Sequence, residues 1–312
     1  MGDCLLLTSP VSALKRQFPG FRVSVLVERR FAGCFRNNRD FDHILSPGNK
    51  LAAAALLVTR RFDAIINLHG GPTSFAYSCL ACGPRIGAEH YGYSKLYHGL
   101  FPPPDPQAHT TESTLNVFRW MGLEVEKAPP LRYLVQPRER EAMERKFGTR
   151  PYVVIHPAAV METKRWPAQR FAQIAKAMQD RQFTVVLTCG PGEENMVGEV
   201  AREAPGTSIM LGLTIPELAE LIRGAKLFIG NDSGPMHLAA AVGTPTIAVW
   251  GSSDSRRWHP WEVEHRLVQN HFECNPCPGY RCLVAASPLC IESVTVEQVD
   301  TALEEMLAVH AH

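Results

Sequence analysis

Short apolar runs alternate with longer amphipathic stretches along this chain. In the first half, the pattern predicts helices at 10–18, 31–37, 50–61, 72–82 and 111–121, and strands at 22–27, 42–45, 63–68 and 85–88. In the second half, it predicts strands at 152–155, 184–188, 208–211, 227–229 and 246–250, and helices at 167–181, 193–203, 214–224, 235–242 and 295–309. Strands that alternate with helices form parallel sheets, so the predicted fold class is α/β. Residues 91–109 are rich in Tyr, Pro and His and are predicted to form a long loop.

A proline-rich stretch separates the two alternating halves. Pro129, Pro130, Pro137 and Pro151 surround a charged helical segment at 138–147. A chain of 312 residues is long enough for two domains of ordinary size. We therefore expect two doubly wound, Rossmann-like domains that face a cleft, formed by residues 1–137 and 138–312, with the option that the terminal helix packs back on the first domain.

The segment from 227 to 251 carries the clearest candidate site. An apolar strand leads into the polar turn Gly230-Asn231-Asp232-Ser233-Gly234, and a helix with Pro235 in its first turn follows and stops at Gly243. A loop in this position lies at the carboxyl end of a parallel strand, where such sheets bind ligands. The N–H groups at the helix start suit a phosphate, Gly234 permits close approach, and His237 lies one turn further on. The plainer alternative is that Asp232 or Ser233 caps the helix and His237 is a core residue.

Two further loops follow strands of the second half. Lys164 lies between the strand at 152–155 and the helix at 167–181, where its ammonium can meet a diphosphate, although a solvated Lys-Arg pair is the simpler alternative. Glu193 follows the strand at 184–188, where a carboxylate can accept both hydroxyls of a ribose. Glu194 is the second candidate for this role. Acidic residues in a first helical turn are equally typical of a helix that needs no ligand, an alternative that applies more to Glu194 than to Glu193.

The sequence motifs around Lys164, Glu193 and Asp232 together resemble those of one protein family. The pattern D-[ST]-G-x-M-H-x-A-A-A-x-G-x-P is matched by Asp232, Ser233, Gly234, Met236, His237, Ala239, Ala240, Ala241, Gly243 and Pro245. His156-Pro157 and Lys164-Arg165-Trp166-Pro167 match a K-x-W-P element that follows a strand, and Glu193 matches a G-x-P-x-E position. Over nearly its whole length, the chain resembles the ADP-heptose:lipopolysaccharide heptosyltransferase family, glycosyltransferase family nine. The resemblance implies a GT-B fold.

The resemblance also implies an activity and its residues. ADP-heptose would donate a heptose to a lipopolysaccharide inner-core acceptor with inversion, and neither a cofactor nor a metal would be needed. The donor would be bound by Thr163, Lys164, Glu193, Asp232, Ser233, Gly234 and His237. Gly2-Asp3 matches the family's G-D pair, whose aspartate is the general base, so Asp3 is the expected catalytic residue.

The family's first strand precedes that G-D pair and has no counterpart in this chain. We therefore expect that a start codon was misassigned or that the chain is a fragment. This leaves a catalytically impaired nucleotide-sugar-binding protein as an alternative function.

Positively charged residues of the first half are the candidates for binding the acceptor. Arg60, Arg61 and Arg85 are candidates for binding an acidic, phosphorylated sugar lipid, with solvated surface arginines as the alternative.

The net charge of +1 gives no general attraction to nucleic acid, and no nucleic-acid partner is expected. The longest apolar run, residues 51–58, is too short to span a bilayer. We expect a cytoplasmic enzyme that makes peripheral contact with the inner face of the inner membrane.

Cysteines cluster near the C-terminus. Cys274, Cys277, Cys282 and Cys290 lie within seventeen positions, which leaves a structural metal site, and hence a metal or redox protein, as an alternative to packed thiols. A nicotinamide-dependent dehydrogenase is disfavoured, because neither half has a G-x-G-x-x-G turn after its first strand.

Overall fold

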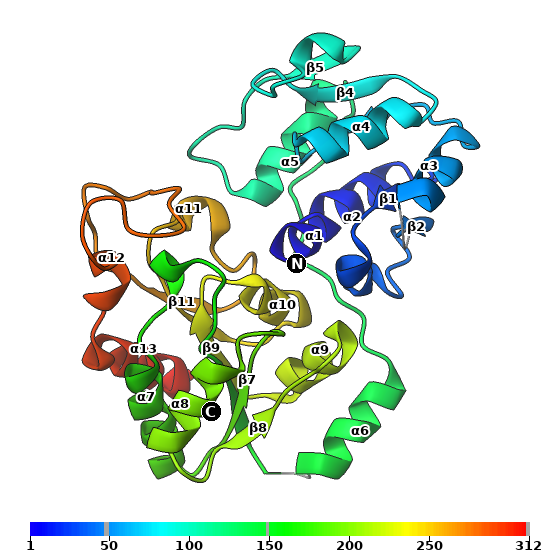
Figure 1. Ribbon diagram of the computed structural model, residues 1–312. Coiled ribbons are helices and arrows are strands. Elements are labelled where there is room, and N and C mark those ends of the chain that lie inside the picture. Colours follow the sequence, from blue (N-terminus) through cyan, green and yellow to red (C-terminus); the bar gives the residue numbers. More distant parts are fainter. Residues whose placement is uncertain (47–49, 148–149, 310–312) are drawn as a thin grey trace. The chain divides into compact units, whose positions relative to one another are not determined.

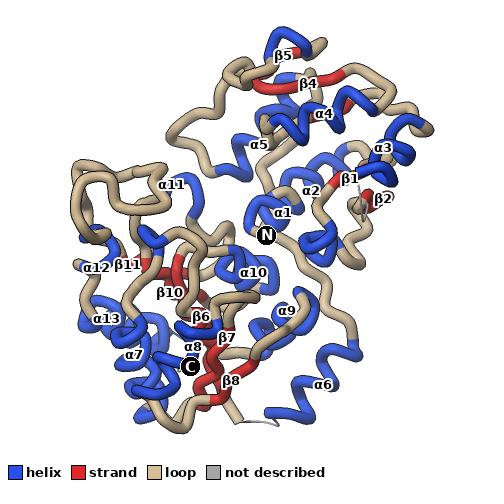
Figure 2. Tube along the Cα trace, viewed as in Figure 1, coloured by secondary structure: helices blue, strands red, loops and turns tan. Residues whose placement is uncertain are grey.

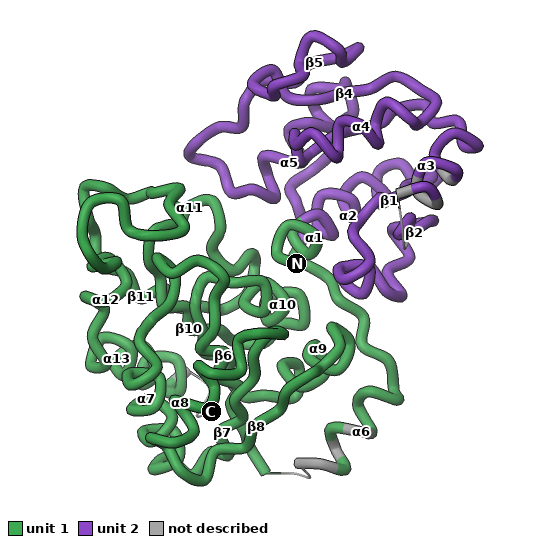
Figure 3. The backbone as a smooth tube through the Cα atoms, viewed as in Figure 1, with its two compact units in different colours: residues 1–6, 130–312 green, residues 7–129 purple. Residues whose placement is uncertain are grey.

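The computed structural model describes residues 1–46, 50–147 and 150–309. The chain divides into two compact units, which Figure 3 colours separately: unit 1 contains residues 1–6 and 130–312, and unit 2 contains residues 7–129. The division at 129/130 precedes the predicted boundary at 137/138, and the first six residues join the C-terminal half. Each unit alternates helices with parallel strands, as the hydrophobic pattern predicts (Figures 1 and 2).

Unit 1 is built on a six-stranded parallel sheet. Its strands in chain order are β6 (Tyr152–His156), β7 (Thr184–Thr188), β8 (Ser208–Met210), β9 (Leu227–Asn231), β10 (Thr246–Val249) and β11 (His265–Val268). The spatial order is β11-β10-β9-β6-β7-β8, with every neighbouring pair parallel. The first strand, β6, therefore lies beside the fourth, β9, and the chain winds outward from this pair in both directions. This pair is the topological switch point, at which open α/β sheets bind ligands.

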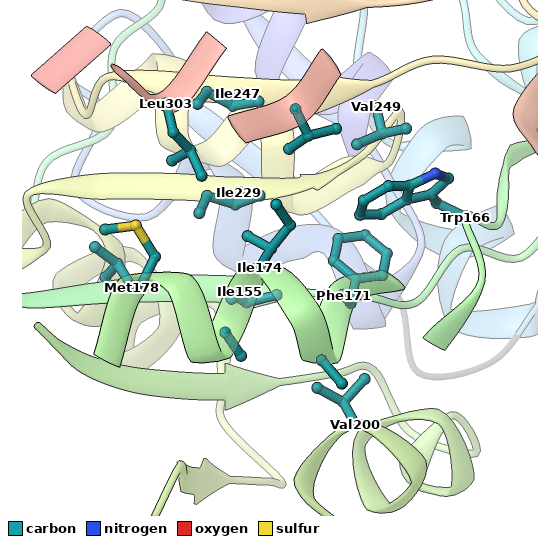
Figure 4. Close-up of a cluster of buried hydrophobic side chains, with 14 of the residues drawn as sticks. Ile155, Trp166, Phe171, Ile174, Met178, Val200, Ile229, Ile247, Val249 and Leu303 are labelled. Carbon is teal, nitrogen blue, oxygen red and sulfur yellow. The ribbon is translucent and has the colours of Figure 1, made fainter. Parts of the chain in front are cut away.

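One hydrophobic core lies between this sheet and the helices α7 (Ala168–Asp180), α8 (Glu194–Glu203) and α13 (Val296–Val309). Figure 4 shows Phe171, Ile174 and Met178 of α7 packed over Ile155 and Ile229 of the central strands. The helices α9 (Ile215–Gly224) and α10 (Gly234–Val242) contact each other and β6, β9 and β10, outside that core. Helices therefore cover the sheet as in a doubly wound domain.

The terminal helix α13 belongs to unit 1. Leu303 and Met306 are buried in its core, and the helix contacts α7, β10 and β11. Arg181, which follows α7, forms an ion pair with Asp300 of α13 at 3.0 Å. The side chains of Thr295 and Gln298 form a capping box at the start of this helix. Packing within the C-terminal unit thus accounts for the apolar face of this helix.

Five further helical elements of unit 1 are described. They are α1 (Gly2–Leu6), α6 (Pro137–Phe147), the 3₁₀ turn η3 (Glu162–Lys164), α11 (Ser255–Trp258) and α12 (Leu289–Glu292). The helix α1 contacts α10, so the start of the chain lies against the helix that follows β9.

Unit 2 contains two small parallel sheets. β1 (Ser24–Leu26) pairs with β2 (His43–Leu45), and the second sheet has the order β3 (Ile65–Ile66), β4 (Arg85–Ala88), β5 (Gly99–Phe101). The helical elements are α2 (Thr8–Gln17), η1 (Arg29–Phe35), α3 (Lys50–Val58), α4 (Pro72–Leu80), η2 (Ser94–Leu96) and α5 (Thr110–Trp120). The segment predicted as a loop at 91–109 therefore contains η2 and the edge strand β5. Among the described helices of both units, none has the length and apolar character needed to cross a membrane.

Candidate active site

Two of the loops that the sequence singles out meet at the switch point of unit 1. One follows β6 and contains η3 with Lys164, and the other follows β9 and contains Asp232. The Lys164 ammonium Nζ lies 2.6 Å from Asp232 Oδ2. The side chain of Asp232 is 5% exposed and that of Lys164 is 19% exposed, so the carboxylate is buried while the cation keeps some access to solvent. The Ser253 hydroxyl also donates to Asp232 Oδ2, which fixes the carboxylate from a second direction.

A fully buried asparagine holds these two loops together. Asn231 ends β9; its Oδ1 accepts a hydrogen bond from Trp166 N at 3.1 Å, and its Nδ2 donates to the Pro157 carbonyl at 2.7 Å. Both partners belong to the loop after β6, on either side of Lys164. The position of the Lys164 backbone therefore depends on Asn231. Sequence reasoning did not assign this residue a role, although it directly precedes the motif that begins at Asp232.

The Thr163 side chain forms hydrogen bonds within the protein. Its hydroxyl donates to the Gly279 carbonyl and accepts from Ser252 Oγ, both at 2.8 Å. A Cβ on Gly251 would lie 2.1 Å from the Thr163 carbonyl oxygen, so the loop after β10 packs directly on the loop after β6. A direct contact between Thr163 and a ligand stays a prediction.

The start of α10 carries a polar side chain that has no partner among the described residues. Ser233 occupies the N-cap position, yet its side chain makes no capping hydrogen bond, and within the described residues its buried Oγ has no partner. The capping role that the sequence left open for Ser233 is therefore not realised. Pro235 lies in the first turn and Gly243 ends the helix at a φ of 78°, as predicted.

His237 is buried in the same helix. Burial lowers the pKa of its imidazole from 6.5 to about 4, while the charges of Asp232 and Asp3 act in the opposite direction. Its Nδ1 has no hydrogen-bond partner in the described part of the chain. The ring is therefore neutral at physiological pH.

The first residues lie against this helix. A Cβ on Gly2 would lie 2.7 Å from His237 Cδ2, and a Cβ on Gly234 would lie 2.8 Å from Met1 Cε. Gly2 and Asp3 belong to the helix α1 rather than to a loop. The exposed Asp3 is close enough for its charge to raise the pKa of His237. Unit 1 thus brings Asp3, His237 and the start of α10 together.

Glu193 lies at the carboxyl edge of the same sheet. It occupies the N-cap position of α8, after β7, and its Oε2 accepts a hydrogen bond from Gly190 N at 3.0 Å. Glu194 is exposed, and hydrogen bonds from backbone N–H groups, including that of Gly192, lower the pKa of its carboxyl group. The loop bearing Glu193 is next to the loop bearing Lys164, because β7 pairs with β6.

The three candidate arginines lie elsewhere. Arg60 and Arg61 precede β3, and Arg85 is the first residue of β4, so all three lie at the amino ends of parallel strands in unit 2. Ligands of open α/β sheets bind at the opposite edge. An acceptor-binding role for these arginines stays a prediction, and their position argues against it.

All the cysteines of the cluster carry free thiols. Cys274 is exposed, Cys277 and Cys282 are half-buried, and Cys290 is buried. Burial raises the pKa of the Cys290 thiol. Among the described residues, no group of three or more His, Cys, Asp or Glu side chains is arranged to hold a metal ion.

A parallel α/β unit with a fixed cation beside a helix start at its switch point is suited to bind a nucleotide diphosphate, which is the arrangement expected of a nucleotide-sugar-dependent transferase. The chain belongs to glycosyltransferase family 9 (heptosyltransferase), whose sequence model matches residues 51–286. It is 31% identical over 289 residues to lipopolysaccharide heptosyltransferase 3 of Escherichia coli K12, which covers 83% of this chain and 82% of that relative.

Solved structures agree on the fold. The family 9 glycosyltransferase from Veillonella parvula has a TM-score of 0.87 at 19% identity, and covers 99% of this chain and 95% of its own. The E. coli ADP-heptose lipopolysaccharide heptosyltransferase II has a TM-score of 0.82 at 18% identity, and covers 100% of this chain and 97% of its own.

Proposed function

We propose that this enzyme transfers a heptose from ADP-heptose to a lipopolysaccharide inner-core acceptor. The observation that carries the proposal is the Lys164 ammonium, held 2.6 Å from Asp232 beside the start of α10. A relative supports the proposal as well, because a solved structure with this fold is described as an ADP-heptose lipopolysaccharide heptosyltransferase. The donor's diphosphate would meet the Lys164 cation, the N–H groups at the start of α10 and the unpartnered Ser233 hydroxyl.

The remaining donor residues follow from the same edge of the sheet. Gly234 would let the diphosphate approach the helix backbone once the Met1 side chain, which packs on it, moves aside. Glu193, one strand away, would accept the ribose hydroxyls. Thr163 acts by anchoring the loop that carries Lys164, and the neutral His237 ring supports the start of α10.

The proposed reaction is a single displacement with inversion. The acceptor oxygen attacks the anomeric carbon, the bond from that carbon to the β-phosphate oxygen breaks, and ADP leaves with the electron pair. Asp3 takes the proton of the acceptor hydroxyl as the new bond forms. Lys164 and the start of α10 stabilise the charge on the departing diphosphate, so the chemistry needs no metal or other cofactor.

The acceptor is lipid-linked, so we also propose that the enzyme works in the cytoplasm at the inner face of the inner membrane. Support comes from an apolar patch in unit 1, formed by Val160, Tyr280, Leu283 and Val284, whose side chains are 68–76% exposed. The Glu162 N–H donates to the Tyr280 carbonyl at 3.0 Å, which joins the two segments of the patch beside Lys164. Arg281 within it is strongly exposed, which suits an anionic lipid surface.

Calorimetric titration of ADP-heptose tests the donor assignment, with UDP-glucose and NAD as comparison ligands. We expect saturable binding of ADP-heptose alone, weakened about 10- to 100-fold in Lys164→Ala, because a hydrogen bond to a charged group contributes about 1.5–3 kcal/mol. Lys176→Ala, which removes an exposed lysine of α7, is the matched control and should bind as the wild type does. Absence of ADP-heptose binding by a folded chain would refute the proposal.

Transfer itself is tested with Asp3→Asn. We expect kcat to fall at least about 100-fold while the donor affinity is unchanged, because only proton transfer is removed. Asp63→Asn, an exposed carboxylate of unit 2, serves as control. Wild-type chain that binds ADP-heptose without transferring it would instead favour the nucleotide-sugar-binding alternative.

The membrane contact has its own test. Vesicles of phosphatidylglycerol and phosphatidylethanolamine should bind the wild type and release Leu283→Asp, whereas Leu51→Asp, a change at an exposed leucine of unit 2, should leave binding intact. Equal vesicle binding by all three would remove the patch from the proposal.

A further inference from the structure

The carboxyl edge of the β3-β4-β5 sheet in unit 2 carries a group of aromatic side chains. The segment 67–71 follows β3 and leads into α4, and the segment 89–98 follows β4 and leads to β5. This is the edge at which open parallel sheets bind ligands, and it is opposite to the edge of Arg60, Arg61 and Arg85. Tyr91, Tyr93 and Tyr97 all lie in the second of these segments.

Two of these rings form a parallel stack. Phe75 of α4 and Tyr93 have centroids 4.6 Å apart and an interplanar angle of 7°, and the Tyr97 ring lies tilted 5.4 Å from Phe75. Phe75 covers one face of Tyr93, yet Tyr93 remains 39% exposed. Phe75 therefore supports Tyr93 as a flat, accessible surface.

Polar groups surround the stack and are held in place by Asn67. This buried amide accepts hydrogen bonds from the N–H groups of His69 and Gly70 at 3.0 and 3.1 Å, and its Nδ2 donates to the Tyr97 hydroxyl at 2.7 Å. The Tyr97 hydroxyl acts as acceptor in this bond, so its own hydrogen can be donated to a ligand. Burial and the neighbouring Tyr97 raise the pKa of Tyr91 to about 12, so this second hydroxyl also stays protonated.

We infer that this aromatic platform, formed by Asn67, His69, Phe75, Tyr91, Tyr93 and Tyr97, binds the saccharide part of the acceptor. A sugar ring has a face of C–H groups and a rim of hydroxyls. The face matches the exposed ring of Tyr93, and the rim matches the hydroxyl of Tyr97 and the exposed imidazole of His69. The inference rests on the proposed transfer to a saccharide acceptor, and it places recognition on ring stacking rather than on the arginines.

Acceptor kinetics test the platform. With lipopolysaccharide from a strain that lacks the corresponding transferase as acceptor, we expect Tyr93→Ala to raise the acceptor KM about tenfold and to leave the KM for ADP-heptose unchanged. Tyr93→Phe keeps the stacked ring and should stay close to the wild type. Phe21→Ala is the matched control, because Phe21 is 42% exposed, stacks on Phe18 and precedes β1, a strand of the other sheet of this unit.

A binding measurement keeps the inference testable if turnover is absent. Saturation-transfer NMR with the same acceptor after removal of its acyl chains should show contacts with the wild type that are lost in Tyr93→Ala and retained in Phe21→Ala. The platform is refuted if Tyr93→Ala and Phe21→Ala behave alike, or if the deacylated saccharide does not bind to a chain that binds ADP-heptose. The second outcome would leave the donor assignment standing.

Discussion

His156 makes the stability of unit 1 sensitive to mild acid. It is the last residue of β6, its side chain is 3% exposed, and its Nδ1 has no partner within the described residues. Burial alone lowers the pKa of this imidazole from 6.5 to about 4. Between these two values the unfolded chain binds a proton that the folded chain does not, so stability is complete above about pH 6.5 and falls as the pH drops toward 4.

The size of the effect follows from the two pKa values. At pH 5 the unfolded state is almost fully protonated at His156 and the folded state is almost fully neutral, so the free energy of unfolding is lower by about 2 kcal/mol than at pH 7.5. His237 has a pKa lowered to about 4 by the same cause and adds a comparable loss.

Urea unfolding at pH 7.5 and at pH 5 measures this loss in the free energy of unfolding. Four of the five tryptophans, at positions 166, 250, 258 and 261, lie in unit 1, so tryptophan fluorescence reports mainly on this unit. We expect the loss of stability between pH 7.5 and 5 to be about 2 kcal/mol smaller in His156→Gln than in the wild type, because Gln does not titrate. His43→Gln, at an exposed position of unit 2, should leave the loss unchanged. An equal loss in wild type and His156→Gln would refute the reasoning, as would an NMR titration of His156 with a midpoint near pH 6.5.

Three further predictions concern the loops of the candidate active site. Asn231→Ala leaves Trp166 N–H and the Pro157 carbonyl unpaired in the interior and should lower the free energy of unfolding by about 2–4 kcal/mol in urea; a loss below about 1 kcal/mol would contradict the bridging role. Gly251→Ala forces the Thr163 carbonyl to move and should therefore weaken ADP binding at least about tenfold, as measured by calorimetry. An unchanged affinity for ADP would show that this packing does not position the Lys164 loop. Addition of EDTA should change the transfer rate by less than about twofold, because the Lys164 cation stabilises the leaving diphosphate; a rate restored only by added divalent metal would overturn this.

The alternation of apolar strands and amphipathic helices was sufficient to predict most of unit 1. The buried strands β6, β7 and β9 are continuous apolar runs, and capping boxes mark the starts of α9 and α13. The strands β5 and β11 were missed, because edge strands are only partly buried and lack such a run: β5 begins at Gly99, and β11 begins with His265 and Arg266.

The sequence predicts that the loops bearing Lys164 and Asp232 open at the same edge of the sheet and that the Asp232 carboxylate orients Lys164. Lys164 and Asp232 are 68 positions apart, and their 2.6 Å contact, together with the pairing of β6 with β9, confirms this prediction. Asn231 was taken as part of a turn, yet it is the last residue of β9 and its amide joins the two loops. The arginines were proposed from charge alone, and their acceptor-binding role stays a prediction.

The Lys164–Asp232 pair also explains why an acidic residue stands beside a site for a diphosphate. Asp232 does not attract the ligand; its carboxylate holds the ammonium at the start of α10 and is itself fixed by Ser253. The two partners are not equivalent, because Asp232 is buried and Lys164 is partly exposed. Removing Lys164 leaves a buried carboxylate without its cation, which costs stability as well as donor affinity, whereas Asp232→Asn leaves a solvated lysine that has lost its orientation. Donor affinity in Lys164→Ala is therefore best compared with the double variant Lys164→Ala/Asp232→Asn, in which the uncompensated buried charge is absent and the loss of the cation alone is measured.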